Sequence, residues 1–192
     1  MLREAKKQDT RARIVRHAVE LFKTKGFDRV TVDEITTACG IAKGTFFNYF
    51  AKKEHVLLHL ADSYAELLRE IAAAHRGLGL MERLSLMFGE LLRIYVQHAE
   101  LLRLTLLETL KAAAAEGSVN LTVFETALGE LLEEAKASGN IRAELETRVG
   151  SSVLAAVFYQ TVLLAQRADD ADTLARQLNL RLRLVWEGIA HA

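Results

Sequence analysis

The stretch from Ala38 to Val56, ACGIAKGTFFNYFAKKEHV, places four aromatic rings within five residues and then adds two lysines. A buried segment would exclude the lysines, and a solvated segment would not favour the rings. Phe46 and Phe50 are four residues apart, so on a helix they share one face and are expected to point inward. The outward face would then carry the candidate DNA-binding residues, which are Lys43, Gly44, Thr45, Phe47, Asn48, Tyr49 and Lys53.

A DNA duplex is the surface that would cover this outward face. Lys43 and Lys53 suit phosphates or guanine edges, and Thr45 can donate a hydrogen bond to a phosphate or a base. Gly44 lets the backbone approach closely, while Phe47 can contact a thymine methyl group. The stretch therefore indicates double-stranded DNA as a partner.

The charge distribution along the chain agrees with this interpretation. Residues 1–53 hold 12 Lys and Arg against 6 Asp and Glu, a net charge of +6. The rest of the chain holds 13 basic against 19 acidic side chains, so its −6 restores the total of zero. Such a split is typical of a polyanion-binding end attached to a body that avoids polyanions.

The composition argues against several other classes of protein. The single cysteine excludes an internal disulfide, and the charged N-terminus lacks the apolar run of a secretory signal, so a cytoplasmic protein is expected. The most apolar stretch, 153–165, has 13 residues, short of the ~20 that a bilayer needs, and no membrane span is expected. No Gly-rich phosphate loop, nucleophile elbow or cysteine-based metal site is present in the sequence, so neither an enzyme nor a cofactor is expected.

Three possible metal ligands follow the basic stretch. His55 and His59 are four residues apart and Asp62 follows three later, so one helix would place all three on one face. Helical surfaces often gather such groups without a metal, and no cysteine ligands are nearby. A metal-responsive regulator is therefore kept as an alternative, beside a helical interaction module that does not bind DNA.

A further set of candidates has polar tips within very apolar segments. Ligand pockets are largely apolar with a few polar groups that fix orientation, so a mostly apolar small-molecule effector is expected here, with a filled core as the alternative. The helix expected over 99–115 is apolar on nearly every side and should lie at the centre of its domain. The candidate ligand-binding residues are Phe88, Tyr95, Thr105, Glu108, Thr109 and Tyr159.

Helices must position these residues, because the chain has no proline and its periodic segments are rich in Leu, Ala and Glu. A first helix is expected from Asp9 or Thr10 to Gly26. A second begins at Thr31, where TVDE provides a capping box with Glu34, and ends at Gly40. The later helices of this all-α chain, about nine in total, are expected over 42–50, 53–75, 81–97, 99–115, 119–138, 146–167 and 171–190.

The helix, tight turn and helix of the N-terminal part are the arrangement that places a helix in the major groove of DNA. We expect a DNA-binding domain over 1–53 and a ligand-binding and dimerisation domain over 54–192, with the fourth helix shared by both. A homodimer held by the last two helices would require a palindromic operator. The candidate dimerisation residues are Ala155, Ala156, Leu174, Leu178, Leu182, Val185 and Ile189.

From Ile14 to Leu57 the chain resembles the DNA-binding domain of the TetR family of bacterial transcriptional regulators. The motif residues at family spacing include the Gly26-Phe27 corner, Lys43-Gly44-Thr45 and Lys53-Glu54. The resemblance implies DNA contact by Thr31 and by the outward face, and a helical domain that binds an effector and dimerises. The function that it implies is that of a ligand-responsive repressor. Two positions depart from the family pattern: Ala42 replaces a capping serine, and Phe47 replaces a tyrosine that reaches phosphate.

Overall fold

The computed structural model of the chain describes residues 2–115, 123–166 and 169–190, without the side chains of 2–5, 61–65 and 188–190. The nine elements within these ranges are all α-helices, so the all-α expectation is confirmed. They form two compact units. Unit 1 comprises the chain up to Ala61 together with Glu100–Thr109, and unit 2 comprises Asp62–Ala99 and the chain from Leu110 onward.

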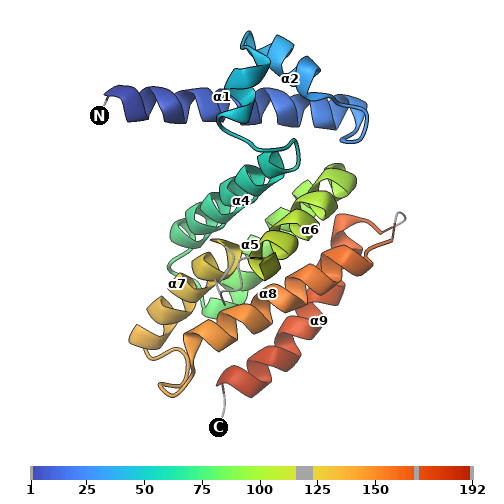
Figure 1. Cartoon of the computed structure of the whole chain (residues 1–192). Helices are drawn as coiled ribbons and strands as arrows, with labels where there is room; N and C mark the ends of the chain where they lie inside the picture. Colours follow the sequence, from blue (N-terminus) through green and yellow to red (C-terminus); the bar gives the residue numbers. More distant parts are fainter. Residues whose placement is uncertain (1, 116–122, 167–168, 191–192) are drawn as a thin grey trace. The chain divides into compact units, whose positions relative to one another are not determined.

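Unit 1 is built on three N-terminal helices, α1 (Leu2–Lys25), α2 (Val32–Cys39) and α3 (Lys43–Phe47). It also contains the start of α4 (His55–Ala74) and part of α6 (Ala99–Ala115). α2 packs on both α1 and α3, as Figure 1 shows in blue and cyan. The core of this unit includes the fully buried side chains of Ile14, Ala18, Ile35, Phe46, Phe50, Val56 and Leu57.

Helix α1 is longer than the sequence pattern predicts, since it begins at Leu2 and not at Asp9 or Thr10. The hydroxyl of Thr10 donates to the carbonyl of Lys6 at 2.9 Å, one turn earlier, and so does not cap a helix start. Residues 2–8, LREAKKQ, are good helix formers without glycine or proline. The helix therefore continues through the position where a cap was expected.

Unit 2 contains α5 (Leu80–Gln97), α7 (Val123–Ala137), α8 (Thr147–Leu164) and α9 (Ala171–Ala190). α8 packs against α7 and α9, and α9 also packs against α5 (Figure 1). The expected start of α7, residues 119–122, and the expected end of α8 at residue 167 lie outside the described residues. The fully buried side chains at the centre of unit 2 include Leu68, Leu84, Met87, Phe88, Leu92, Leu128 and Leu132.

A buried arginine joins three helices of unit 2. Arg83 on α5 is 5% exposed and donates to the carbonyl of Ala72 in the last turn of α4, at 2.9 Å. It also donates to both carboxylate oxygens of Glu134 on α7, at 3.0 and 3.3 Å. This hydrogen-bonded pairing lowers the pKa of Glu134. Arg83 thus fixes the end of α4 to α5 and α7.

The expected domain boundary between Lys53 and Glu54 falls inside unit 1. α4 begins in unit 1 and ends in unit 2, and the middle of α6 belongs to unit 1 while its ends belong to unit 2. The central position predicted for α6 is wrong, because Leu101 and Thr105 are its buried residues while Leu107 is exposed.

Helix α8 meets the length and composition of a membrane span, with a mean hydropathy of 1.2. A helix packed inside a helical domain passes the same test, and α8 has neighbours on two sides in unit 2.

Candidate functional site

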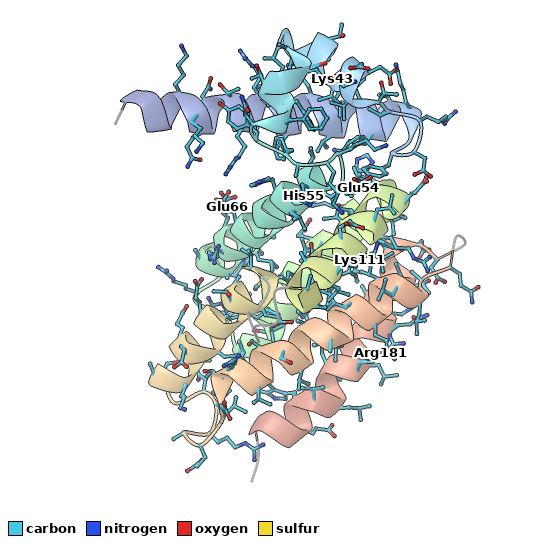
Figure 2. The ribbon with its side chains drawn as sticks, viewed as in Figure 1. Lys43, Glu54, His55, Glu66, Lys111 and Arg181 are labelled. Atoms are coloured by element: carbon cyan, nitrogen blue, oxygen red, sulfur yellow. The ribbon has the colours of Figure 1, made fainter. Side chains whose placement is uncertain are left out.

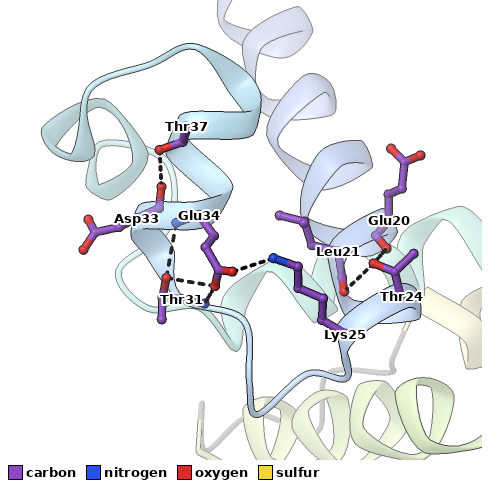
Figure 3. A network of polar contacts seen from close by, with 8 residues as sticks. All are labelled: Glu20, Leu21, Thr24, Lys25, Thr31, Asp33, Glu34 and Thr37. Carbon is purple, nitrogen blue, oxygen red and sulfur yellow. Dashed lines mark hydrogen bonds and ion pairs between the residues drawn. The ribbon is translucent and has the colours of Figure 1, made fainter.

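The loop before α2 is held by a capping box, as the sequence predicts. The Thr31 hydroxyl accepts from the Glu34 amide at 3.2 Å, and the Glu34 carboxylate accepts from the Thr31 amide at 2.8 Å. The ammonium of Lys25 adds an ion pair with Glu34 at 2.7 Å (Figure 3). Together these donors lower the pKa of Glu34 from 4.5 to about 2, the Lys25 contact being the largest cause. Thr31 therefore fixes the start of α2.

The turn between α2 and α3 depends on Gly40. Its φ of 64° lies in the left-handed region, where a side chain would be strained. The amide of Ile41 donates to the carbonyl of Thr36 at 3.0 Å, which closes the end of α2. Ala42 begins α3 without a side-chain cap, so α3 is positioned by its buried face and not by its own terminus.

Phe46 and Phe50 anchor α3 and are both buried, with ring centroids 5.4 Å apart. The predicted outward face is present: Lys43, Gly44 and Asn48 are exposed, and Phe47 is 47% exposed.

Thr45 and Tyr49 are half-buried at the edges of this face. The outward face thus combines an ammonium, an amide, a bare backbone segment and a ring on one short helix.

Lys43 has a partner that the sequence pattern did not reveal. Its ammonium lies 2.9 Å and 3.0 Å from the two carboxylate oxygens of Asp33, in the first turn of α2. Both side chains are more than half exposed. Figure 3 shows the Asp33 carboxylate pointing away from the Thr31, Glu34 and Lys25 network. An acidic residue in the first turn of α2 is visible in the sequence. That its carboxylate reaches Lys43 on α3 follows only from the geometry of the turn between the two helices.

Lys53, which the sequence predicts to contact DNA, has partners within unit 1. Its ammonium donates to the carbonyls of Phe27 and Val30, at 2.7 and 2.9 Å, and lies 4.2 Å from the centre of the Phe27 ring. These contacts hold the loop between α1 and α2, and the predicted contact of Lys53 with DNA stays a prediction. The neighbouring Lys52 is exposed and lies 3.8 Å from Glu108, which also belongs to unit 1.

Two candidate ligand-binding residues are brought together in unit 2. Phe88 stacks on Phe124 and Phe158, with centroids 6.1 and 5.2 Å apart, and Phe124 packs on Tyr159 at 5.4 Å. Tyr95 is buried and donates its hydroxyl to the carbonyl of Val162 at 3.0 Å.

Phe124 and Phe158 are members of this aromatic cluster that sequence reasoning missed. Phe158 directly precedes Tyr159 on α8, which was a usable signal. The cluster formed by Phe88, Phe124, Phe158 and Tyr159 provides broad apolar surface in unit 2.

The other three candidate ligand residues belong to unit 1. Thr105 donates to the carbonyl of Leu101 at 2.9 Å, and Thr109 donates to that of Thr105 at 2.8 Å, so both hydroxyls are satisfied within α6. Glu108 lies within ion-pairing distance of Lys52. Local partners thus account for polar groups that the sequence suggested for a ligand.

The metal alternative gains no support from the described residues, which contain no cluster of three or more His, Cys, Asp or Glu suited to an ion. His59 packs edge-on against Phe50 at 5.4 Å, and His55 starts α4 (Figure 2). The side chain of Asp62 lies outside the described residues.

The structure also corrects the predicted dimerisation stripe. Leu174, Leu178 and Leu182 are buried within unit 2 itself, as is Ala155, because α9 turns these leucines toward α5 and α8. Ala156 is exposed and Val185 is half-buried, while the side chain of Ile189 lies outside the described residues.

Apart from Ala156, the outward-pointing faces of α8 and α9 carry other residues than those predicted for dimerisation. Leu180 and Leu184 are 65% and 67% exposed on α9, and Val149, Val153 and Leu164 are exposed on α8. Together with Ala156, these exposed side chains form what we call the outer α8–α9 face.

Comparisons with known proteins agree with the helical geometry. Residues 14–60 match the family described as bacterial regulatory proteins, tetR family. The regulator TcmR of Streptomyces glaucescens is 42% identical over 57 residues, which are 30% of this chain and 25% of that protein. Five curated relatives match over 39 to 57 residues, and the match covers 25% of their own length or less.

Two similarities extend over nearly the whole chain. The fatty acid metabolism regulator protein of Bacillus subtilis is 28% identical, covering 92% of this chain and 93% of that protein. The structure of FadR from Thermus thermophilus, a TetR-family transcriptional repressor in complex with lauroyl-CoA, matches with a TM-score of 0.75 and 29% identity, covering 95% of this chain and 96% of that one. The N-terminal residues thus match the TetR family of bacterial regulatory proteins, and over nearly its whole length the chain is similar to a repressor of that family.

Proposed function

We propose that this chain is a transcriptional repressor that binds operator DNA through α3 and releases it when a long-chain acyl-CoA binds to unit 2. The observation that carries the DNA part is the outward face of α3, where Lys43, Gly44, Phe47 and Asn48 are exposed above the buried Phe46. A short helix anchored by one aromatic face and presenting donors on the other suits a major groove. Such a regulator works in the cytoplasm, where bacterial DNA lies.

The effector class is supported by two similarities and by the aromatic cluster. A fatty acid metabolism regulator and a repressor bound to lauroyl-CoA are both similar to this chain over more than nine-tenths of its length. An acyl chain needs an extended apolar wall, and four rings from α5, α7 and α8 provide one in unit 2. Phe124, Phe158 and Tyr159 are only half-buried, so their rings are accessible to an apolar ligand.

The proposed assembly is a homodimer formed by the outer α8–α9 face. Exposed leucines and valines on two neighbouring helices, with the small Ala156 among them, suit a four-helix contact between two copies. Two-fold symmetry then places two α3 helices on a palindromic operator, with half-sites one or more helical turns apart.

The proposal is tested by fluorescence anisotropy with a labelled duplex from the gene's own upstream region. At fixed salt the protein should bind this duplex more tightly than a random duplex of equal length. Lauroyl-CoA should weaken binding, while free CoA should not. A 100-fold loss of affinity corresponds to about 2.7 kcal/mol of coupling, and the operator must then weaken acyl-CoA binding by the same factor.

Two variants separate the two sites. Phe47→Ala should weaken operator binding and leave acyl-CoA binding unchanged, whereas Phe158→Ala should do the reverse, with folding of both checked by thermal unfolding. Equal binding to upstream and random duplexes would contradict the repressor. Equal effects of lauroyl-CoA and CoA would contradict the effector class while leaving DNA binding intact.

A further inference from the structure

We infer that Asp33 and Lys43 act as one unit that reads a G·C base pair in each operator half-site. The inference rests on the proposed DNA binding and adds to it a specific base pair. It starts from the ion pair between α2 and α3, in which the ammonium of Lys43 lies 2.9 and 3.0 Å from the carboxylate oxygens of Asp33.

The position of the pair suits contact with base edges. Lys43 is the first residue of α3, and the leading residues of a recognition helix are those that reach the bases. Its side chain and that of Asp33 are 56% and 68% exposed, so neither is committed to the core. Phe47, one turn further along α3, is exposed as well. The pair therefore lies at the leading end of the outward face of α3.

The chemistry of the pair matches one base-pair edge. In the major groove a G·C pair presents two adjacent acceptors, guanine N7 and O6, followed by the amino donor at cytosine N4. An ammonium offers three donors and a carboxylate only acceptors. Lys43 can therefore donate to N7 and O6 while Asp33 accepts from N4. Guanine O6 and cytosine N4 are hydrogen-bonded to each other at about 2.9 Å, close to the spacing of the two protein groups.

An A·T pair fits less well. Its edge alternates acceptor, donor and acceptor, so an ammonium paired with a carboxylate meets a single acceptor. If that acceptor is thymine O4, the thymine methyl group lies beside the ammonium. The same two side chains would thus make fewer hydrogen bonds to A·T than to G·C.

Asp33 also restricts what Lys43 can do elsewhere on DNA. A free lysine on this face would contact phosphates of any sequence, and each such contact makes binding more dependent on salt. The carboxylate neutralises the ammonium and orients it, which lowers attraction to the phosphate backbone. The pair therefore contributes to the choice of sequence more than to affinity for DNA in general.

The test begins with selection of sites by the full-length protein from a pool of random duplexes. The selected half-site should contain one G·C pair that the protein prefers over A·T by about 5- to 150-fold, the usual range for a good base contact. Asp33→Ala and Lys43→Met, whose new side chains neither donate nor accept, should each lose most of this preference, at that position only. Asp33→Ala should also bind random DNA more tightly, with a salt slope steeper by about 0.9 per subunit.

Two base analogues assign the contacts to individual residues. Removing N7 with 7-deazaguanine at that pair should weaken the wild type and Asp33→Ala but not Lys43→Met. A methyl group on cytosine N4 should weaken the wild type but not Asp33→Ala.

Lys25→Met is the matched control, because Lys25 also forms an exposed ion pair with an acidic residue of α2. It should leave base preference unchanged.

Each outcome decides between the two proposals. If no duplex is preferred over random DNA, the repressor itself is contradicted. If the protein selects a site but Asp33→Ala and Lys43→Met keep its full base preference, DNA binding stands and the paired reading of G·C is wrong. A selected site without a G·C preference, or equal analogue effects in the wild type and both variants, would also contradict the paired reading while leaving DNA binding intact.

Discussion

Lys43 and Lys53 are ten residues apart in one basic stretch, yet they have different neighbours. Lys43 is exposed and faces a carboxylate, whereas the ammonium of Lys53 donates to two loop carbonyls above the Phe27 ring. A carbonyl oxygen and a phosphate oxygen both accept from a lysine, so the residue type alone does not separate the two roles. The position of the acceptor oxygens in the fold separates the two roles.

Lys53→Met should destabilise unit 1, because it removes two charge-assisted hydrogen bonds while keeping the aliphatic packing. We expect a loss of about 1 to 2 kcal/mol in the free energy of unfolding, below the upper range for such bonds since Lys53 is only half-buried. Urea unfolding followed by circular dichroism measures this, with Lys52→Met as the control. A lower salt slope of DNA binding with unchanged stability would instead show that Lys53 contacts phosphate.

At this scale the sequence predicts residue types on a face better than it predicts partners. Phe46 and Phe50 point inward as the four-residue spacing requires, and Thr31 caps α2 as its motif requires. The partners of Lys53 and Lys43 come from other elements, 23 to 26 residues and 10 residues away in the chain. The spacing of residues along one helix carries no information about contacts with residues on other elements.

At the scale of elements, α2 is the helix whose ends are most fully specified by local residues. Its start has the reciprocal hydrogen bonds of Thr31 and Glu34, and its end has the left-handed Gly40. Helix α3 has neither, since Ala42 provides no cap. The orientation of α3 therefore depends on α2 and on two buried rings.

The stability of this arrangement should depend on pH through Glu34. Its pKa in the folded chain is lowered from 4.5 to about 2, so its contribution is fully present above pH 4.5 and is lost as the pH falls toward 2. Between these limits the wild type should lose stability faster than Glu34→Gln, which keeps a capping amide without a charge. Thermal unfolding at pH 7, 4 and 2.5 compares the two. Parallel losses in both proteins would mean that the charge of Glu34 contributes nothing to stability.

The sequence predicts helix boundaries well where a glycine or a capping box marks them. It predicts them poorly where composition is the only signal. The Thr10 hydroxyl resembles a cap in the sequence but bonds back to Lys6 inside α1. The apolar residues of α6 suggested a central helix, yet Leu107 is exposed. An apolar helix is buried only where neighbours cover it, and the sequence of α6 does not specify those neighbours.

At the scale of the whole molecule, the stripe of leucines spaced four residues apart on α9 was correctly identified as apolar but assigned to the wrong surface. Leu174, Leu178 and Leu182 are buried by the chain's own helices, and Leu180 and Leu184 face outward. Two apolar stripes on one helix are indistinguishable by periodicity alone. Only the packing of α9 on α5 and α8 decides which stripe stays exposed.

Leu184→Arg should therefore produce a monomer. A charged side chain in the middle of the outer α8–α9 face would be buried without a partner in the proposed dimer, and operator affinity should fall because both half-sites can no longer be held together. Sedimentation velocity at micromolar concentration measures the mass. Val123→Arg, an exposed apolar position on α7, is the control and should leave the mass unchanged. A dimer that persists in Leu184→Arg would place the interface elsewhere.

Unit 1 is assembled from two stretches of chain, the first ending at Ala61 and the second running from Glu100 to Thr109. If unit 1 reads DNA as proposed, a single cut would not move the whole of it onto another regulator. A chimera joined only after Lys53 or Ala61 would take its α6 from the recipient, and Lys52 would meet whatever residue stands in place of Glu108. One recombination event can therefore exchange operator specificity only between two proteins whose α6 segments are already compatible. For other pairs, both stretches of unit 1 have to be moved together.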